Sequence, residues 1–593
     1  MRRMLRVSNL LAVLVTVITV VQGAGCARRE PVSLELAAPH AEAERWAASV
    51  IGTLSLEQKV AQMICEQIRG EYVPENDDRY QYWLKLARDY GIGGFVLYGG
   101  TPLDTAALLN RLQNAARVPL LISADFEGGP GQQIAGASEF PANMALSAIG
   151  SAELAYEVGR VGAREGRAVG IHLTYSPVVD IQTRPENPGL SVRSFGGDLD
   201  LLGRMAAAYI KGYQENGMLA TAKHYPGRGE VELIPGTEFT VNRKSSEQVQ
   251  GEDLLAFRKA IEAGIAFVMS EHIAVPSLTG GSDVPASVDR TLATDWLRGK
   301  LGFTGALTSD DLWYPKMVQR FGAERTGILS IQAGHDMLLK PADAVKMMAA
   351  IVEAVKAGEI TEARIDESVK RLLYWKARLN LHRNRFVDPG TIPAVVGTRA
   401  HRDLVRRVAD ESATLLVNKG VLPLRRDKLG KILHVSIQKN ENDPAPPLVA
   451  ARLQTLLPVA RGFQFRPGAD PALRGLAVQA AREADTVIVS LFYQRTVYKD
   501  NGPLPGAERK LVEDLCRMRP RSTVVMAYGN PYLVTSTPEA PVFMVGYGEG
   551  GFYGNQLVYA DSFVRLMTGD IAPKGRLPVK VSADFPIGAG IRY

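Results

Sequence analysis

Two short polar stretches follow apolar runs, and their residue types could do chemistry. Lys223 and His224 come closely after the run 218–220 and lead into a Pro226-Gly227 turn. A buried strand ends in this way when its tip holds polar groups at a cleft and the chain then turns sharply. Lysine offers a compact cation, and histidine an oriented donor and acceptor. The alternative is a strand end with a solvated lysine and a core histidine.

Asp310 and Asp311 end another apolar run, 305–309. Because side chains alternate along a strand, we expect one carboxylate to face the cleft and the other to bond backbone or a neighbour. The carboxylate in the cleft is a candidate nucleophile or electrostatic stabiliser. The alternatives are a metal ligand or a structural cap. No histidine-rich spacing accompanies the pair, so we expect no metal.

Further polar residues complete a set that suits a ligand with many hydroxyls. Asp125 closes a third apolar run, and Arg193 precedes a tight turn. Together with Lys223 and His224 they would accept from and donate to hydroxyl groups. The glycines at 128–129 do not open a phosphate-binding loop.

The elements that must position these residues alternate between apolar strands and helix-length stretches. A helix starts after Ser55, which has Gln58 at the capping-box position. Continuous apolar strands with helical crossovers indicate a parallel sheet covered on both faces. Seven or eight such units predict a (β/α)8 barrel over 46–382, with its chemistry at the carboxyl ends of the strands. The expected strands are 94–98, 120–124, 173–179, 218–224, 267–270, 305–309 and 336–339.

A second, smaller domain is predicted after a linker at 383–400, which contains Pro389, Gly390 and Pro393. Apolar strands again alternate with helices, which favours an α/β sandwich over 401–593. The expected strands are 434–437, 486–490, 523–527 and 542–545.

The composition is that of an ordinary globular protein, with 46% apolar and 22% charged residues in 593. Such a length exceeds one core and predicts two or more domains. The net charge of +6 is spread along the chain without a basic, aromatic stripe, so nucleic acid is not an expected partner.

The first 26 residues have the pattern of an export signal. Charged residues 1–4 precede the apolar run 10–21, and Gly-Ala-Gly-Cys follows at 23–26. Small residues before Cys26 resemble a bacterial lipoprotein processing box, and cleavage without lipidation is the alternative. We therefore expect an exported protein, in the periplasm or at the outer membrane or cell surface. A lipid on Cys26 would be its contact with the membrane, and 27–45 would be a tether.

The chain resembles the family-three glycoside hydrolases, and within them the exo-β-N-acetylglucosaminidase branch. The resemblance covers most of the chain from Leu54 to the end. Barrel stretches that carry it are 125–129 (DFEGG), 193–196 (RSFG), 223–227 (KHYPG), 285–287 (PAS), 309–312 (SDDL) and 333–336 (AGHD). In the second domain, 417–424, 575–579 and 588–593 match.

The resemblance implies roles for particular residues. Asp310 would be the nucleophile of a retaining mechanism with a covalent glycosyl-enzyme. Asp311 would be a supporting second carboxylate. His272 lies where the family has a histidine near the cleft, and both a structural and a substrate-binding role stay open. The residues that match positions binding the terminal sugar are Asp125, Arg193, Lys223 and His224.

The chain departs from the branch directly after the KHYPG stretch. The branch continues with His-Gly-Asp and then carries an Asp-Ser-His on a mobile loop, whose histidine is the acid/base. Here Arg228 replaces the first histidine, residues 234–236 stand at the positions of the Asp-Ser-His, and no histidine occurs between His224 and His272. Pro130 and Gln133 stand where the branch usually has arginines. The expected proton donor is therefore missing, and part of the sugar pocket is altered.

Protonation of the leaving group still requires an acid with a raised pKa. Glu230 is nearest the Pro-Gly turn and is our first choice. Glu232 and Glu238 lie on the same loop, and each of the three glutamates could equally be a solvated loop charge. In the β-glucosidase branch a glutamate of the second domain does this work. The corresponding loop here, 494–501, has no glutamate but carries Asp500.

These features predict an exported, retaining exo-β-glycosidase that removes a terminal β-linked sugar, such as N-acetylglucosamine, from a glycan or oligosaccharide. No metal or cofactor is expected. Two alternatives stay open. One is a catalytically impaired sugar-binding lipoprotein, and the other is a glycoside phosphorylase or transglycosidase, in which a weaker need for an acid would explain the missing histidine.

Overall fold

The computed structural model describes residues 39–184, 187, 189–233, 240–493, 503–548 and 556–592, without the side chains of 232 and 233. The predicted export signal, Cys26, Glu238 and Asp500 lie outside these residues. Among the described residues, no helix is both long and apolar enough to cross a membrane. All described residues belong to one compact unit.

Eight parallel strands form the first sheet, and each pairs with the next along the chain. The last strand pairs with the first through Ile64 and Leu338, and a bridge from Thr308 to Met337 closes the ring. This confirms the predicted (β/α)8 barrel. Its strands are β1 (Ile64–Gly70), β2 (Gly94–Gly100), β3 (Leu121–Ala124), β4 (Leu173–Thr174), β5 (Leu219–Tyr225), β8 (Phe267–Ser270), β10 (Ala306–Ser309) and β11 (Leu338–Leu339).

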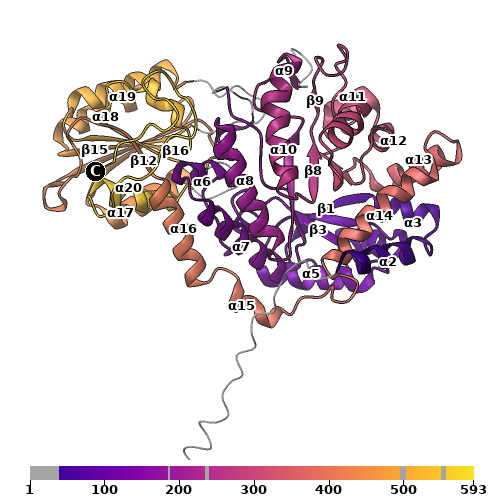
Figure 1. The fold of residues 1–593 in the computed structure, drawn as a ribbon. Coiled ribbons are helices and arrows are strands. Elements are labelled where there is room, and N and C mark those ends of the chain that lie inside the picture. The colour runs from indigo at the N-terminus through magenta and orange to yellow at the C-terminus, as the bar shows by residue number, and fades with distance from the viewer. Residues whose placement is uncertain are drawn as a thin grey trace, which may run out of the picture. The chain divides into compact units, whose positions relative to one another are not determined.

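Helices cover the barrel, and α7 and α8 lie side by side in Figure 1. The capping box expected at Ser55 and Gln58 is present at the start of α3. The main helices are α2 (His40–Ile51), α3 (Leu56–Gln62), α4 (Asp78–Lys85), α5 (Pro102–Ala115), α6 (Asn143–Ile149), α7 (Ala152–Ala168), α8 (Leu199–Gln214), α10 (Leu254–Glu262), α11 (Pro315–Phe321), α12 (Ala323–Ala333), α13 (Ala344–Lys356) and α14 (Glu362–Arg378). A small sheet, β6 (Val231–Leu233), β7 (Thr240–Asn242) and β9 (Ile273–Ala274), follows β5 and β8.

The second sheet has six strands in the order β12-β17-β16-β15-β13-β14. Only β12 pairs antiparallel with its neighbour. Figure 1 shows α18 and α19 on one face and α17 and α20 on the other, which confirms the predicted α/β sandwich. The elements are α16 (Arg399–Ser412), β12 (Thr414–Asn418), β13 (Ile432–Gln438), α17 (Ala445–Leu456), β14 (Val459–Phe465), α18 (Pro471–Glu483), β15 (Thr486–Phe492), α19 (Gly506–Met518), β16 (Thr523–Tyr528), β17 (Val542–Gly546) and α20 (Val558–Met567).

Several details differ from the expectations. The strands β1, β12 and β14 were not among the expected ones. Helix α2 begins at His40, inside the stretch assigned to the tether, and α15 (Ile392–Val395) and the start of α16 lie inside the predicted linker. The domain boundaries therefore stay predictions.

Cys65 and Cys516 are both buried and free, so they form no disulfide.

Candidate active site

Asp310 follows β10, the seventh barrel strand, and lines a cavity of about 170 Å³. Its backbone N–H donates to the Ser270 carbonyl at the end of β8, at 2.8 Å. Its Oδ1 accepts from the backbone N–H of Asp311 at 2.7 Å. These two bonds fix both the backbone and the carboxylate of Asp310 at the carboxyl end of the barrel, where such folds place their chemistry.

Asp311 lines the same cavity, although only one of the two carboxylates was expected there. The strand ends at Ser309, so the alternation of a strand does not extend to these residues. The Asp311 Oδ2 accepts from Lys340 Nζ at 2.7 Å, as expected of the carboxylate that bonds a neighbour. Burial and the nearby Asp310 raise the pKa of Asp311 to about 6, against the effect of Lys340.

A cluster of alternating charges forms another wall of the site. Glu127 receives two hydrogen bonds from the Arg193 guanidinium, at 2.6 and 2.7 Å, and lies 2.7 Å from Lys223 Nζ. Lys223 also donates to Asp125 at 2.8 Å. Burial opposes the charged forms, but the two cations hold the pKa of Glu127 below its ordinary value. Likewise, Asp125 and Glu127 outweigh burial and raise the pKa of Lys223.

His224 is held by Asp180, a fully buried carboxylate after β4. The Asp180 Oδ2 accepts from the His224 backbone at 3.1 Å and lies 2.8 Å from its Nδ1. The Oδ1 accepts from the Arg228 backbone at 2.7 Å. Burial raises the pKa of Asp180 to about 7, and the Arg228 backbone N–H opposes this shift. Asp180 thus ties both ends of the Pro-Gly turn to one carboxylate.

Arg228 also lines the cavity, at the position where the sequence departs from the family pattern. Its guanidinium forms a buried ion pair with Glu271, which follows β8. Asn187 donates to the backbone carbonyls of Arg228 and Gly229, at 2.5 and 3.0 Å. The backbone N–H, the side chain and the backbone carbonyl of Arg228 are therefore bound by three different residues.

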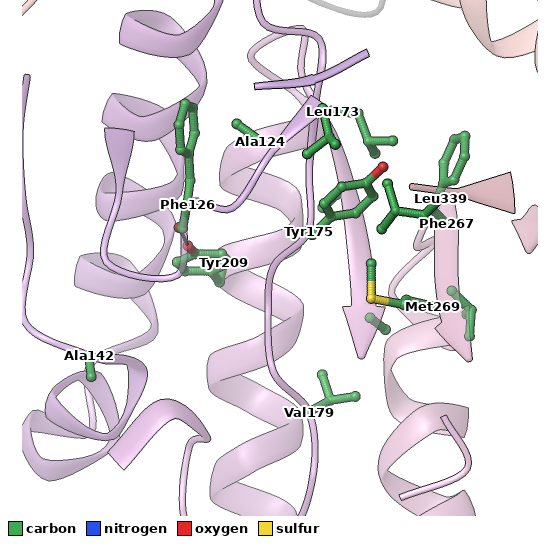
Figure 2. Packing of buried hydrophobic residues seen from close by; sticks show 14 of the residues in the cluster. Ala124, Phe126, Ala142, Leu173, Tyr175, Val179, Tyr209, Phe267, Met269 and Leu339 are labelled. Atoms are coloured by element: carbon green, nitrogen blue, oxygen red, sulfur yellow. Dashed lines mark hydrogen bonds between the residues drawn. The ribbon is translucent and has the colours of Figure 1, made fainter. Parts of the chain in front are cut away.

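The cavity floor is formed by the barrel interior. Figure 2 shows Tyr175, Met269 and Leu339 among the buried side chains there, and all three line the cavity. The Tyr175 hydroxyl accepts from Ser123 Oγ at 2.9 Å. Tyr98 completes the lining from β2. The floor is thus mostly apolar, while the walls are charged.

The structure brings five of the predicted site residues together around this cavity: Asp125, Arg193, Lys223, His224 and Asp310. His272 is not among the lining residues. Its Nε2 lies 3.1 Å from the Asp311 carbonyl, and its ring stacks on Tyr314 with centroids 5.4 Å apart. His272 therefore contacts the backbone of Asp311, next to the nucleophile candidate, without lining the cavity.

Glu230, the first choice for the acid, does not line the cavity. Its side chain is 44% exposed, and its Oε2 accepts from Thr183 at 2.8 Å and lies 3.6 Å from Lys244 Nζ. Neither partner lines the cavity, so the described structure gives no support to Glu230 as the acid. Residues 234–239 and 494–502 lie outside the described chain.

Polar residues of the cavity or the charged cluster that had no predicted role include Tyr98, Glu127, Asp180 and Lys340. Asp180 directly follows an apolar run that the sequence did show, and Glu127 comes three residues after the end of another. Lys340 follows β11, which is only two residues long. A search for polar residues after every apolar run would have found these three.

A buried carboxylate, a ring of cations and acids, and a small cavity at the carboxyl end of a barrel define an enzyme for a small polyhydroxylated ligand. Residues 55–374 match the glycosyl hydrolase family 3 N terminal domain, and residues 413–586 match the family 3 C-terminal domain. The chain belongs to glycosyl hydrolase family 3.

Relatives match over nearly the whole chain. A protein from Cellulomonas fimi, named beta-N-acetylglucosaminidase/beta-glucosidase, is 29% identical over 551 residues, which cover 90% of this chain and 95% of the relative. A beta-N-acetylglucosaminidase structure from Paenibacillus sp. is 26% identical, with a TM-score of 0.75, and the match covers 89% and 99%. The structure of the beta-glucoside phosphorylase BglX is 25% identical, with a TM-score of 0.79 and coverage of 92% and 97%. This chain is a β-glycosidase of the family.

Proposed function

We propose that this protein is a retaining exo-β-glycosidase that removes one terminal β-linked sugar, with N-acetylglucosamine as the leading candidate. Asp310 attacks the anomeric carbon as its bond to the leaving oxygen breaks, and a covalent glycosyl-enzyme forms. Water then releases the sugar with its configuration retained. The observation that carries the proposal is the carboxylate of Asp310, held at the mouth of a cavity for one sugar unit.

The surrounding charges support this reading. Asp125 can accept from sugar hydroxyls, and Arg193 and Lys223 can donate to them, while Glu127 contacts both cations and keeps them in place. A volume of about 170 Å³ is below that of pockets for drug-sized ligands and suits a single terminal unit. The relatives' names favour N-acetylglucosamine or glucose as that unit.

A trapping experiment tests the proposal. The protein is incubated with 5-fluoro β-glycosides that keep the substituent on C2 and carry an activated leaving group, and its peptides are analysed by mass spectrometry. We expect one sugar on the peptide that contains Asp310. Asp310→Asn should prevent labelling and lower turnover of aryl β-glycosides by about a thousandfold or more. The matched control is Asp388→Asn in the exposed linker. Labelling of another residue, or a loss of only a few-fold, would refute Asp310 as the nucleophile.

Phosphorolysis is a second candidate, because the structural neighbour BglX is named a phosphorylase. Phosphate would then take the place of water in the second step and need no general base. A turnover rate that rises with added phosphate, together with release of a sugar 1-phosphate, would favour this reading over hydrolysis.

Export of the protein, with a lipid on Cys26, stays part of the proposal. The charged, apolar and small-residue succession over residues 1–26 supports it.

A further inference from the structure

The reaction needs a proton donor for the leaving oxygen, and that donor must reach the cavity that holds Asp310. It must also carry its proton near neutral pH. Carboxyl groups and imidazole are the side chains that titrate nearest to that range. Among the described residues that line the cavity, those with such groups are Asp125, His224 and Asp311, apart from Asp310 itself.

Two of these three candidates are committed to other charged groups. Asp125 Oδ1 accepts from Lys223 Nζ at 2.8 Å, so this carboxylate takes part in an ion pair. The His224 ring lies between Asp180, 2.8 Å from its Nδ1, and the Arg193 guanidinium, 3.4 Å from its Nε2. Because Nε2 faces a permanent cation, a positive charge on this ring is opposed. Asp311 is the candidate that is left.

The Asp311 carboxylate is held through one of its two oxygens. Lys340 Nζ donates to Oδ2 at 2.7 Å, and Trp313 Nε1 donates to the same oxygen at 3.2 Å. Among the described residues, none donates to Oδ1. Lys340 also donates to the Tyr98 hydroxyl at 3.3 Å, which fixes the ammonium group between two residues of the cavity lining. Oδ1 of an oriented carboxyl group can therefore carry the proton.

The groups that face Asp311 allow it to hold that proton. Burial acts most strongly, and Asp310 and Asp125 add like charges, while Lys340 opposes them. Their sum raises the pKa of Asp311 to about 6. His272 contacts the Asp311 carbonyl rather than its carboxylate. The acid and the nucleophile of a retaining glycosidase lie about 5–5.5 Å apart, and neighbouring residues at the rim of one cavity can meet this requirement.

We propose that Asp311 is the general acid and base of the reaction. This rests on the proposed glycosidase function. In the first step, the Asp311 proton moves to the leaving oxygen as its bond to the anomeric carbon breaks and Asp310 bonds to that carbon. In the second step, Asp311 takes a proton from water as the water oxygen bonds to the carbon and the bond to Asp310 breaks. Both carboxyl groups then regain their starting state.

Two aryl β-glycosides test the proposal, each prepared with N-acetylglucosamine and with glucose. The 2,4-dinitrophenyl group leaves without a proton, whereas the phenyl group requires one. We expect Asp311→Asn to lower kcat/KM for the phenyl glycoside by about a hundredfold or more, and for the dinitrophenyl glycoside by less than about tenfold. The matched control is Asp388→Asn in the exposed linker, which should change neither value.

Azide gives a readout that a merely structural role would not move. In Asp311→Ala, added azide should attack the anomeric carbon of the glycosyl-enzyme and release Asp310 without transfer of a proton. We expect faster turnover of the dinitrophenyl glycoside, with the β-glycosyl azide as the product.

The pH profile tests the same assignment in the wild type. For the phenyl glycoside, kcat/KM should fall as pH rises above about 6, because Asp311 then loses its proton. Lys340→Met should move this fall to higher pH, since Lys340 opposes the raised pKa of Asp311.

Equal losses on the two glycosides in Asp311→Asn, or absence of the glycosyl azide in Asp311→Ala, would overturn Asp311 as the acid and leave the glycosidase function standing. If the wild-type protein releases sugar from neither glycoside, the proposed function itself is wrong.

Discussion

Asp180 is the residue whose ionisation matters most to the Pro-Gly turn, because one carboxylate receives hydrogen bonds from both of its ends. Its pKa in the folded protein is about 7, well above its ordinary value of 3.8. The folded protein therefore binds this proton more tightly than the unfolded chain does. It follows that this group makes unfolding easier as pH rises from about 4 to about 7.

Asp180→Asn removes that titration. We expect the melting temperature of the variant, relative to that of the wild type, to rise steadily between pH 4 and pH 7 and then to level off. The underlying difference in the free energy of unfolding can change by about 1.4 kcal/mol per pH unit for a single proton. Loss of a hydrogen-bond acceptor lowers the melting temperature of the variant by a constant amount at every pH. Only the pH dependence of the difference therefore reports the titration of Asp180. A constant difference across the range would contradict the assignment.

The sequence predicts which residues belong to the site better than it predicts which of them contact one another. Asp125, Lys223 and Asp310 were found because each ends an apolar run, and the structure gathers them at one cavity. Glu127 lies between two cations that come from distant segments, and such a pairing exists only after the barrel closes. Glu230 was chosen for its nearness in sequence to the turn, and its contacts with Thr183 and Lys244, neither of which lines the cavity, could not be predicted from that nearness.

The elements that carry the site depend on close packing between α7 and α8. A Cβ added at Gly159 of α7 would lie 2.5 Å from the Tyr209 carbonyl of α8, which is too close for any side chain. Tyr209 in turn donates to the Phe126 carbonyl at 3.1 Å, in the segment between Asp125 and Glu127. The contact of the two helices therefore also supports the charged wall of the site.

Gly159→Ala should force these helices apart and lower the free energy of unfolding by about 1–3 kcal/mol. Differential scanning calorimetry measures this as a lower melting temperature. The control is Gly475→Ala in α18, where an added Cβ meets nothing within 4 Å. That change should stabilise the protein slightly, by about 0.5–1 kcal/mol, because alanine favours a helix. Equal effects of the two changes would refute the close-packing argument.

Most barrel strands could be predicted because they are short, apolar and buried on both faces. β1 could not, since Glu66, Gln67 and Arg69 interrupt its apolar pattern where the strand reaches the barrel mouth. β14 lies at the edge of the second sheet and has an exposed Arg461 and Gly462. Edge strands commonly carry charges on exposed positions, and their sequences then resemble loops.

At the scale of the whole molecule, the Glu165 carboxylate bonds to segments that lie far apart in the sequence. This fully buried carboxylate of α7 accepts from the Ser138 backbone and hydroxyl, both at 2.7 Å. It also accepts from the Gly397 backbone at 3.0 Å and lies 2.6 Å from His401 Nδ1. Gly397 is in the predicted linker, and His401 is in α16.

Glu165→Ala leaves these donors buried without their acceptor, and we expect a loss of about 3–5 kcal/mol in the free energy of unfolding. Limited proteolysis should cut faster within 383–400, and the melting temperature should fall. Glu353→Ala, which removes an exposed partner of Lys356, is the control and should change neither measurement. An unchanged cleavage rate in Glu165→Ala would show that the linker is held by other contacts.

Among the described residues near the site, two that are not glycine adopt a left-handed backbone that favours glycine: Ser191 at φ 45° and Lys340 at φ 46°. Ser191 starts the turn that bears Arg193, and Lys340 donates to Asp311, which lines the cavity. An engineer who seeks a heat-resistant variant would replace such residues with glycine or asparagine, since this relieves backbone strain. At Lys340 the same replacement deletes the ammonium group that donates to Asp311. Selection for heat resistance alone would therefore be drawn to a position that holds a carboxylate of the candidate site.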